Sequence, residues 1–224
     1  WIEEITRAAS TSNINVNFNG GAEGMRYAVS GSYLSQEGIV IGSKFERINM
    51  NANLEQRIGK KIKLGATMKM ATSQNKGMVN TWGEGTITKT ALQQNPFADP
   101  EFDLDAPSDD EDPSAEWNNE NIVTYIEDTD IQFETSRMLG NVFFDYKILD
   151  GLKFYTSYGF NKYGKDAHEF NPKSTRKGRN YGGRAKFDKS KTTNTVFQSR
   201  LNYNKKFGNH KIYATAGFET KRNG

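Results

Sequence analysis

Apolar and polar residues alternate along most of the chain with a period of two. In one stretch Ile48, Met50, Ala52 and Leu54 occupy every second position, and asparagines fill the positions between them. This is the period of an extended strand with one apolar and one polar face. Comparable stretches recur about eight times, and only residues 1–9 suggest a helical turn. The pattern therefore predicts an all-β chain of about eight antiparallel strands.

The predicted connections between these strands are short and long in turn. The short ones cover residues 20–24, 57–61, 149–151 and 207–210, and the longer ones cover 36–44, 73–133 and 164–190. Strands that run up and down with all tight turns at one end produce this order, whereas a Greek-key sandwich has no reason to sort its loops. Predicted strands of about 10–12 residues also fit a tilted membrane strand. We therefore expect an antiparallel, up-and-down transmembrane β-barrel segment, with 73–133 as a long extracellular loop and 164–190 as a basic one.

The two faces of the predicted strands differ in chemistry. One face carries mostly aliphatic, aromatic and small residues, while the other carries Asn, Arg, Lys, Gln, Ser and Thr. Aromatic residues gather near strand ends, as at the two interfaces of a membrane barrel, among them Tyr33, Phe45, Tyr146 and Phe154. On this interpretation the polar face lines the lumen, and it includes Arg26, Arg47, Asn49, Lys63, Arg137 and Arg200. A soluble β-rich carbohydrate-binding or adhesin module, with its apolar face buried in a core, would show the same alternation and stays open as the alternative.

Composition narrows the choice between these classes. The chain of 224 residues is only 35% hydrophobic and contains 21 glycines, and its mean hydropathy is −0.79. This apolar content is low for a compact globule, so we expect either much loop or an apolar surface one side chain deep. No apolar run reaches the ~18 residues of a membrane-spanning helix, although membrane strands give a far weaker signal. The net charge of +3 indicates no nucleic-acid partner.

No residue pattern in the sequence indicates an enzyme. There are no cysteines, and the two histidines, His168 and His210, fall in connections at opposite ends of the predicted sheet. The chain lacks a paired-histidine metal motif, a nucleophile elbow and a phosphate-binding glycine loop followed by a helix. We therefore expect no catalytic residues, no metal and no cofactor.

The long predicted loops hold the candidate ligand-binding residues. Trp82, Trp117, Tyr125 and Tyr181 carry rings that can stack on sugars, although long loops also use aromatic residues for small cores of their own. The acidic run at 99–116 holds nine carboxylates. Clustered carboxylates suit calcium, but the spacing does not match an EF-hand, and a solvated loop explains the run equally.

The first quarter of the chain resembles the SusC/RagA-type TonB-dependent outer-membrane transporters. The resemblance begins with a family stretch that is matched here by Trp1, Glu3, Glu4, Ile5 and Ala8. Three further family elements follow in order, at Asn13 to Gly21, Tyr27 to Tyr33 and Gly38 to Arg47. One departure is Asn19, where the family commonly has Ser or Thr before paired glycines.

The resemblance implies that residues 1–224 are part of a TonB-dependent receptor barrel of about 22 strands. They would be early barrel strands, with the plug domain and the C-terminal strands absent. It further implies a place in the outer membrane of a Gram-negative, Bacteroidetes-like cell, in contact with its lipid. The expected partners are a SusD-like surface lipoprotein and TonB, reached through the missing N-terminal region. The expected cargo is an oligosaccharide, or a peptide.

Overall fold

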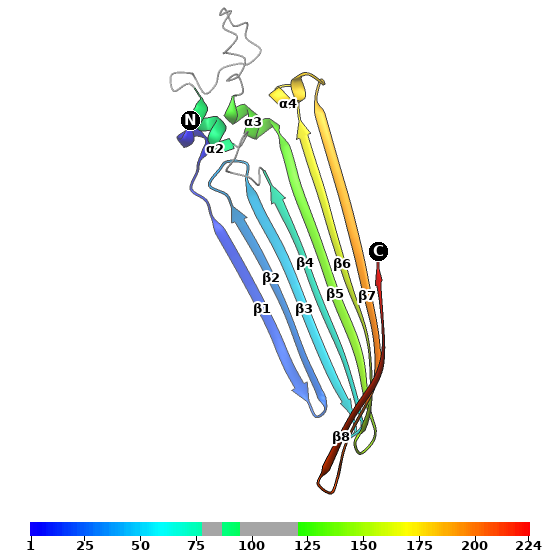
Figure 1. Cartoon of the computed structure of the whole chain (residues 1–224). Helices are drawn as coiled ribbons and strands as arrows, with labels where there is room; N and C mark the ends of the chain where they lie inside the picture. Colours follow the sequence, from blue (N-terminus) through cyan, green and yellow to red (C-terminus); the bar gives the residue numbers. More distant parts are fainter. Residues whose placement is uncertain (78–86, 95–120) are drawn as a thin grey trace, which may run out of the picture.

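The chain forms one antiparallel sheet of consecutive strands. A computed structural model describes residues 1–77, 87–94 and 121–224. The strands are β1 (Thr11–Ala22), β2 (Met25–Glu37), β3 (Lys44–Ile58), β4 (Ile62–Lys76), β5 (Asp130–Leu149), β6 (Leu152–Asn171), β7 (Arg184–Phe207) and β8 (His210–Asn223). Each pairs with its sequence neighbour, so that β1 and β8 are the edges (Figure 1). The predicted all-β, up-and-down architecture is confirmed, and the sheet of this segment is open.

The two ends of the sheet differ as the connection lengths predict. Four tight turns lie at one end, which we call the tight-turn end, and the helices lie at the other, the long-loop end (Figure 1). Glycine permits these turns: Gly151 has a φ of 87°, and a Cβ there would lie 2.7 Å from the carbonyl oxygen of Asn204. A side chain would therefore be strained by both the backbone conformation and the neighbouring strand. No helix in the described part of the chain is long and apolar enough to cross a membrane.

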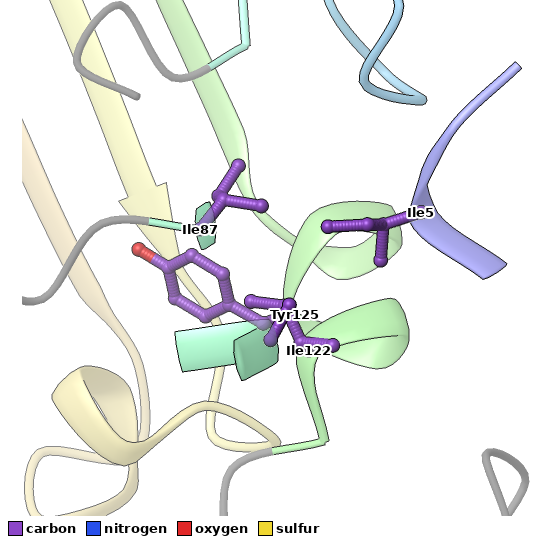
Figure 2. Close-up of a cluster of buried hydrophobic side chains, with 5 residues drawn as sticks. Ile5, Ile87, Ile122 and Tyr125 are labelled. Atoms are coloured by element: carbon purple, nitrogen blue, oxygen red, sulfur yellow. The ribbon is translucent and has the colours of Figure 1, made fainter. Parts of the chain in front are cut away.

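The buried apolar cluster lies beyond the sheet, at the long-loop end. There α1 (Ile2–Ile5), α2 (Ile87–Gln93) and α3 (Ile122–Asp128) bring together Ile5, Ile87, Ala91, Ile122 and Tyr125 (Figure 2). The Asn121 side chain caps α3 by accepting from the amides of Val123 and Thr124. The cluster therefore joins the start of the chain to the β4–β5 connection.

The β2–β3 connection closes against the same cluster. The backbone amide of Ile41 donates to the carbonyl oxygen of Ile5 at 2.9 Å, and Val40 packs on the buried side chains. Three segments that are distant in sequence thus form one small folded unit, which we call the outer cap: α1, the loop 38–43 and the helices α2 and α3.

Two predicted loop boundaries need correction. Strands β6 and β7 continue through most of the predicted basic loop at 164–190, and only residues 172–183, which include α4 (Arg176–Arg179), connect them. The predicted loop at 73–133 is shortened at both ends by β4 and β5 and contains α2 and α3. The physical reason is that both faces of the β6–β7 extension carry charges, so the apolar alternation that reveals a strand is missing there. Backbone pairing and ion pairs such as Lys189–Asp166, at 2.9 Å, hold the extension instead.

Candidate functional site

The strand register places all six predicted lumen-facing residues on one face, which we call the polar face. Arg26 pairs with Glu55, which lies on the same face of β3 as Arg47 and Asn49. Asn49 pairs with Ala71, which pairs with Arg137 in β5. Lys63 shares this face of β4 with Ala71, and Arg200 joins it through its pairing with Tyr155. Residues paired across antiparallel strands point to the same side, so the six side chains share one surface.

Hydrogen bonds and ion pairs connect neighbouring strands along the polar face. The Asn49 amide donates to Ser32 Oγ at 2.9 Å, and the Asn51 amide donates to Ser30 Oγ at 3.2 Å. The Lys63 ammonium lies 2.9 Å from the Glu55 carboxylate. Such contacts satisfy polar groups on a surface that retains water. The face therefore presents amide, hydroxyl and guanidinium groups to whatever lies against it.

Near the tight-turn end, four side chains form a ladder across the polar face. Lys63 Nζ lies 5.5 Å from the centre of the Phe143 ring, which is stacked at 6.1 Å on Tyr155. Arg200 Cζ lies 4.4 Å from the Tyr155 ring. The two predicted cations therefore rest on two aromatic rings that the sequence analysis did not identify. Phe143 and Tyr155 stand at odd-numbered positions of β5 and β6, which belong to the polar face. Two aromatic residues among polar ones are the signal that could have revealed the ladder.

We expect the substitution Gly65→Ala to destabilise the sheet through this ladder. A Cβ at Gly65 would lie 2.1 Å from the Phe143 ring, and overpacking of this kind costs about 1–3 kcal/mol. Denaturant unfolding of the full-length protein measures the change. The control is the same substitution in a Phe143→Ala background, where the clash is gone and Ala is the better strand residue. Equal destabilisation in both backgrounds would contradict the packing role of Phe143.

The opposite face, which we call the apolar face, leaves large hydrophobic side chains uncovered. Phe18, Met50 and Val142 are 65%, 54% and 53% exposed. The face extends over all eight strands and also includes Ile14, Val16, Tyr27, Val29, Tyr33, Ile48, Leu54, Leu64, Met68, Met70, Phe197, Leu201, Ile212 and Phe218. No second layer of the described chain packs on it (Figure 1). Monomeric soluble proteins rarely expose an apolar surface of this extent.

The apolar residues form a band that runs diagonally across the strands. One row of paired residues begins at Phe18 in β1, passes through Ala52 and Met68, and ends at Arg222 in β8. In β1 the apolar residues lie in this row or on its long-loop side, whereas in β8 they lie on its tight-turn side. A drift of about one residue per strand, at ~3.4 Å per residue and ~4.8 Å between strands, corresponds to a tilt of about 35–40°. Barrel strands in membranes are tilted by this amount.

The aromatic residues at the edge of the band are only partly as predicted. Tyr33 lies on the apolar face, and its hydroxyl donates to Glu46 at 2.6 Å. The ring lies in the apolar band, while the hydroxyl hydrogen-bonds a polar residue beyond the edge of the band. This is the arrangement expected of an interfacial tyrosine. Phe45, however, pairs with Gln36 and therefore points to the polar face. Its assignment to the same aromatic band is wrong, because it is an odd number of residues from Ile48.

The structure separates two of the four predicted ligand-binding residues, Tyr125 and Tyr181. Tyr181 follows α4 and is 74% exposed, whereas Tyr125 is 5% exposed in the outer cap (Figure 2). Tyr125 therefore packs the cap and does not offer its ring to solvent. Trp82, Trp117 and the acidic run at 99–116 lie outside the described residues. Among the described residues there is no group of carboxylates and histidines arranged to hold a metal.

The connection that carries Tyr181 is tied to the end of β6 by charge. The Glu169 carboxylate accepts from the Asn171 amide at 3.0 Å and lies 3.6 Å from the Lys177 ammonium. The Asn171 hydrogen bond and the Lys177 charge hold the pKa of Glu169 below its usual range. The carboxylate therefore stays ionised and keeps these contacts at neutral pH.

No protein-family model matches the chain. TonB-dependent receptor P3 of Formosa agariphila is 29% identical over 232 residues, and TonB-dependent receptor P39 of the same bacterium is 26% identical over 228 residues. The matches cover 99% and 98% of this chain but only 22% and 20% of those proteins. This chain thus spans about a fifth of the length of these relatives.

A solved structure extends the likeness to the fold. The RagAB peptide importer in its open-open state matches the whole chain with a TM-score of 0.70 and 18% identity, and the match covers 26% of that protein chain. At this identity the likeness concerns the fold alone. The two curated relatives are named TonB-dependent receptors, which is the wider class of the transporters that the first quarter of the chain resembles.

Proposed function

We propose that the chain belongs to the SusC/RagA-type TonB-dependent receptors and forms eight consecutive barrel strands of an outer-membrane importer. In this arrangement the apolar band faces lipid and the polar face lines the lumen. The long-loop end, with the outer cap, lies outside the cell. The segment contributes lumen wall and outer surface and takes no part in catalysis.

The diagonal apolar band is the observation that carries this proposal. A soluble carbohydrate-binding or adhesin module would bury its apolar face under a second layer, as sandwiches do. Here the only buried apolar cluster in the described residues lies in the outer cap, away from the band. A surface that is apolar over eight strands and tilted like a membrane barrel fits lipid better than it fits an internal core.

The cargo that we propose is an oligosaccharide, taken up with a SusD-like surface lipoprotein and with energy delivered by TonB. The support is the chemistry of the polar face, where amides, hydroxyls and aromatic rings offer the hydrogen bonds and stacking that sugars use. A peptide is the second candidate, since the RagAB relative in fold is named a peptide importer. TonB would act through a region that precedes this segment.

Deletion of the full-length receptor from its host tests the proposal. We expect the deletion strain to lose growth on one class of oligosaccharide while it still grows on the matching monosaccharide. Loss of growth on peptides alone would replace the sugar cargo with peptide. Cell fractionation is the companion measurement: a receptor found outside the outer membrane, or uptake that persists without TonB, would overturn the transporter proposal.

A further inference from the structure

Two grooves lie next to each other on the apolar face, between β2 and β7. The lower groove, which is the one nearer the tight-turn end, has a volume of about 410 Å³ and is bordered by Ala52, Ala66, Met68, Gly140 and Phe160. Small residues at three of these positions leave a depression in the sheet surface. Its lining is almost wholly apolar, so water has few partners there and an alkyl chain fills the space more favourably.

The second groove, of about 370 Å³, is lined by two methionines, by three lysines and by Asp166, among other residues. Met70 and Met138 border it on β4 and β5, Lys162 borders it in the same row on β6, and Lys189 and Lys191 border it on β7 toward the long-loop end. The register makes Met70 pair with Met138, and Met138 pair with Lys162. The groove therefore lies where the apolar band ends and charge begins.

The register also joins the two grooves. Met68 and Gly140 form the row of the lower groove, and Met70 and Met138 form the row two residues further toward the long-loop end. Side chains two residues apart on one strand point to the same face. An elongated ligand can therefore lie in both grooves, with its alkyl part against Met68 and Gly140 and its head among the lysines.

The charges of the upper groove favour an anionic head. Lys189 is paired with Asp166 at 2.9 Å, and Glu134 pairs with Asp166 across β5 and β6. In the described part of the chain, neither Lys162 nor Lys191 has a carboxylate within ion-pair distance. These two ammonium groups on adjacent strands leave positive charge for an external anion, and phosphate is the anion that a lipid headgroup supplies.

We propose that the two grooves form a binding site for a phosphate-bearing, acylated lipid of the surrounding leaflet. The acyl chain lies in the lower groove, and Lys162 and Lys191 contact the phosphate. This inference rests on the proposed orientation of the apolar face toward lipid. It goes beyond that orientation, because a bulk bilayer needs neither a groove nor paired lysines at one place on the barrel.

The test uses native mass spectrometry of the full-length receptor with dipalmitoyl phosphatidic acid as the probe and dipalmitoylglycerol as its phosphate-free counterpart. We expect the receptor to retain the phosphatidic acid preferentially. The double variant Lys162→Gln/Lys191→Gln should bind it about tenfold or more weakly, since each lysine near the headgroups contributes about 1 kcal/mol. Ala52→Leu, which narrows the lower groove, should also weaken retention.

The matched control is Lys165→Gln/Lys186→Gln. These lysines lie on the same two strands, and the register places them on the polar face, so the control removes the same charge from the other side. An equal loss of binding in both double variants would overturn the inference, as would displacement of the lipid by inorganic phosphate alone. Fractionation separates the two proposals: a receptor that resides in the outer membrane and shows no lipid preference overturns this inference only.

Discussion

Replacing Met50 by arginine in the full-length receptor should destabilise the folded barrel in a bilayer by about 2–4 kcal/mol. Met50 is 54% exposed on the apolar face, and it lies between Ile48 and Ala52 within the band of β3. An arginine there would place a charge in hydrocarbon, far from either interface. Urea unfolding of the receptor in phospholipid bilayers measures the effect.

The control for this prediction is Asn53→Arg. Asn53 lies on the same strand, three residues away, and pairs with Thr67 on the polar face. The same charge then enters a wet surface, and we expect a change within about 0.5 kcal/mol. If both arginines lower the free energy of unfolding equally, or if Met50→Arg does not lower it, the apolar face does not contact lipid. The soluble β-rich module would then be the better interpretation.

Truncating Ile122 to alanine should open the outer cap locally. Ile122 is 1% exposed and lies in the buried cluster with side chains of α1 and α2 (Figure 2). Removing a buried isoleucine side chain beyond its Cβ costs about 2–5 kcal/mol where the site cannot collapse. Because the cap is held together by this cluster, we expect amide exchange to rise at least about tenfold in residues 38–43 and 121–128.

Hydrogen exchange of the full-length receptor resolves this local effect. The amide of Ile41, which donates to the Ile5 carbonyl oxygen, reports on the contact between α1 and the β2–β3 connection. Ile39→Ala is the control, because Ile39 is in the same connection but is 67% exposed. Unchanged exchange at Ile41 in Ile122→Ala would show that the cap is held by contacts other than this cluster.

The outer cap also bears on which predicted ligand-binding residues are accessible. It unites the N-terminal segment, the β2–β3 connection and the two helices before β5 into one body at the long-loop end. Tyr125, expected as a ligand-binding ring, is part of its packing. Tyr181 lies in a separate connection and is exposed. Of the two predicted aromatic residues that the structure describes, Tyr181 is therefore the one whose ring can contact a solute.

Local pattern was enough to predict the strands, their faces and their order. Alternation assigns Arg47 and Ile48 to opposite faces whatever the rest of the chain does, because successive side chains of a strand point in opposite directions. Short turns such as the one at Gly151 force the strands on either side to pair, which fixes four of the seven pairings, and the regular alternation of short and long connections favours the up-and-down order of the rest. The six predicted lumen-facing residues share a face for the same reason.

Register and contacts between distant segments were decided only by the tertiary structure. The tilt of the apolar band depends on how far each strand slides against the next, and no single stretch of sequence carries that offset. The extension of β6 and β7 into the predicted basic loop depends on cross-strand pairing where both faces are charged. The outer cap, the Lys63–Phe143–Tyr155–Arg200 ladder and the two grooves on the apolar face likewise join residues from different strands and loops. By itself the sequence determined the two faces of this sheet, because facing is a local property of the backbone. The tertiary structure decided which side chains are neighbours on each face, because the register between strands is set by many pairings at once.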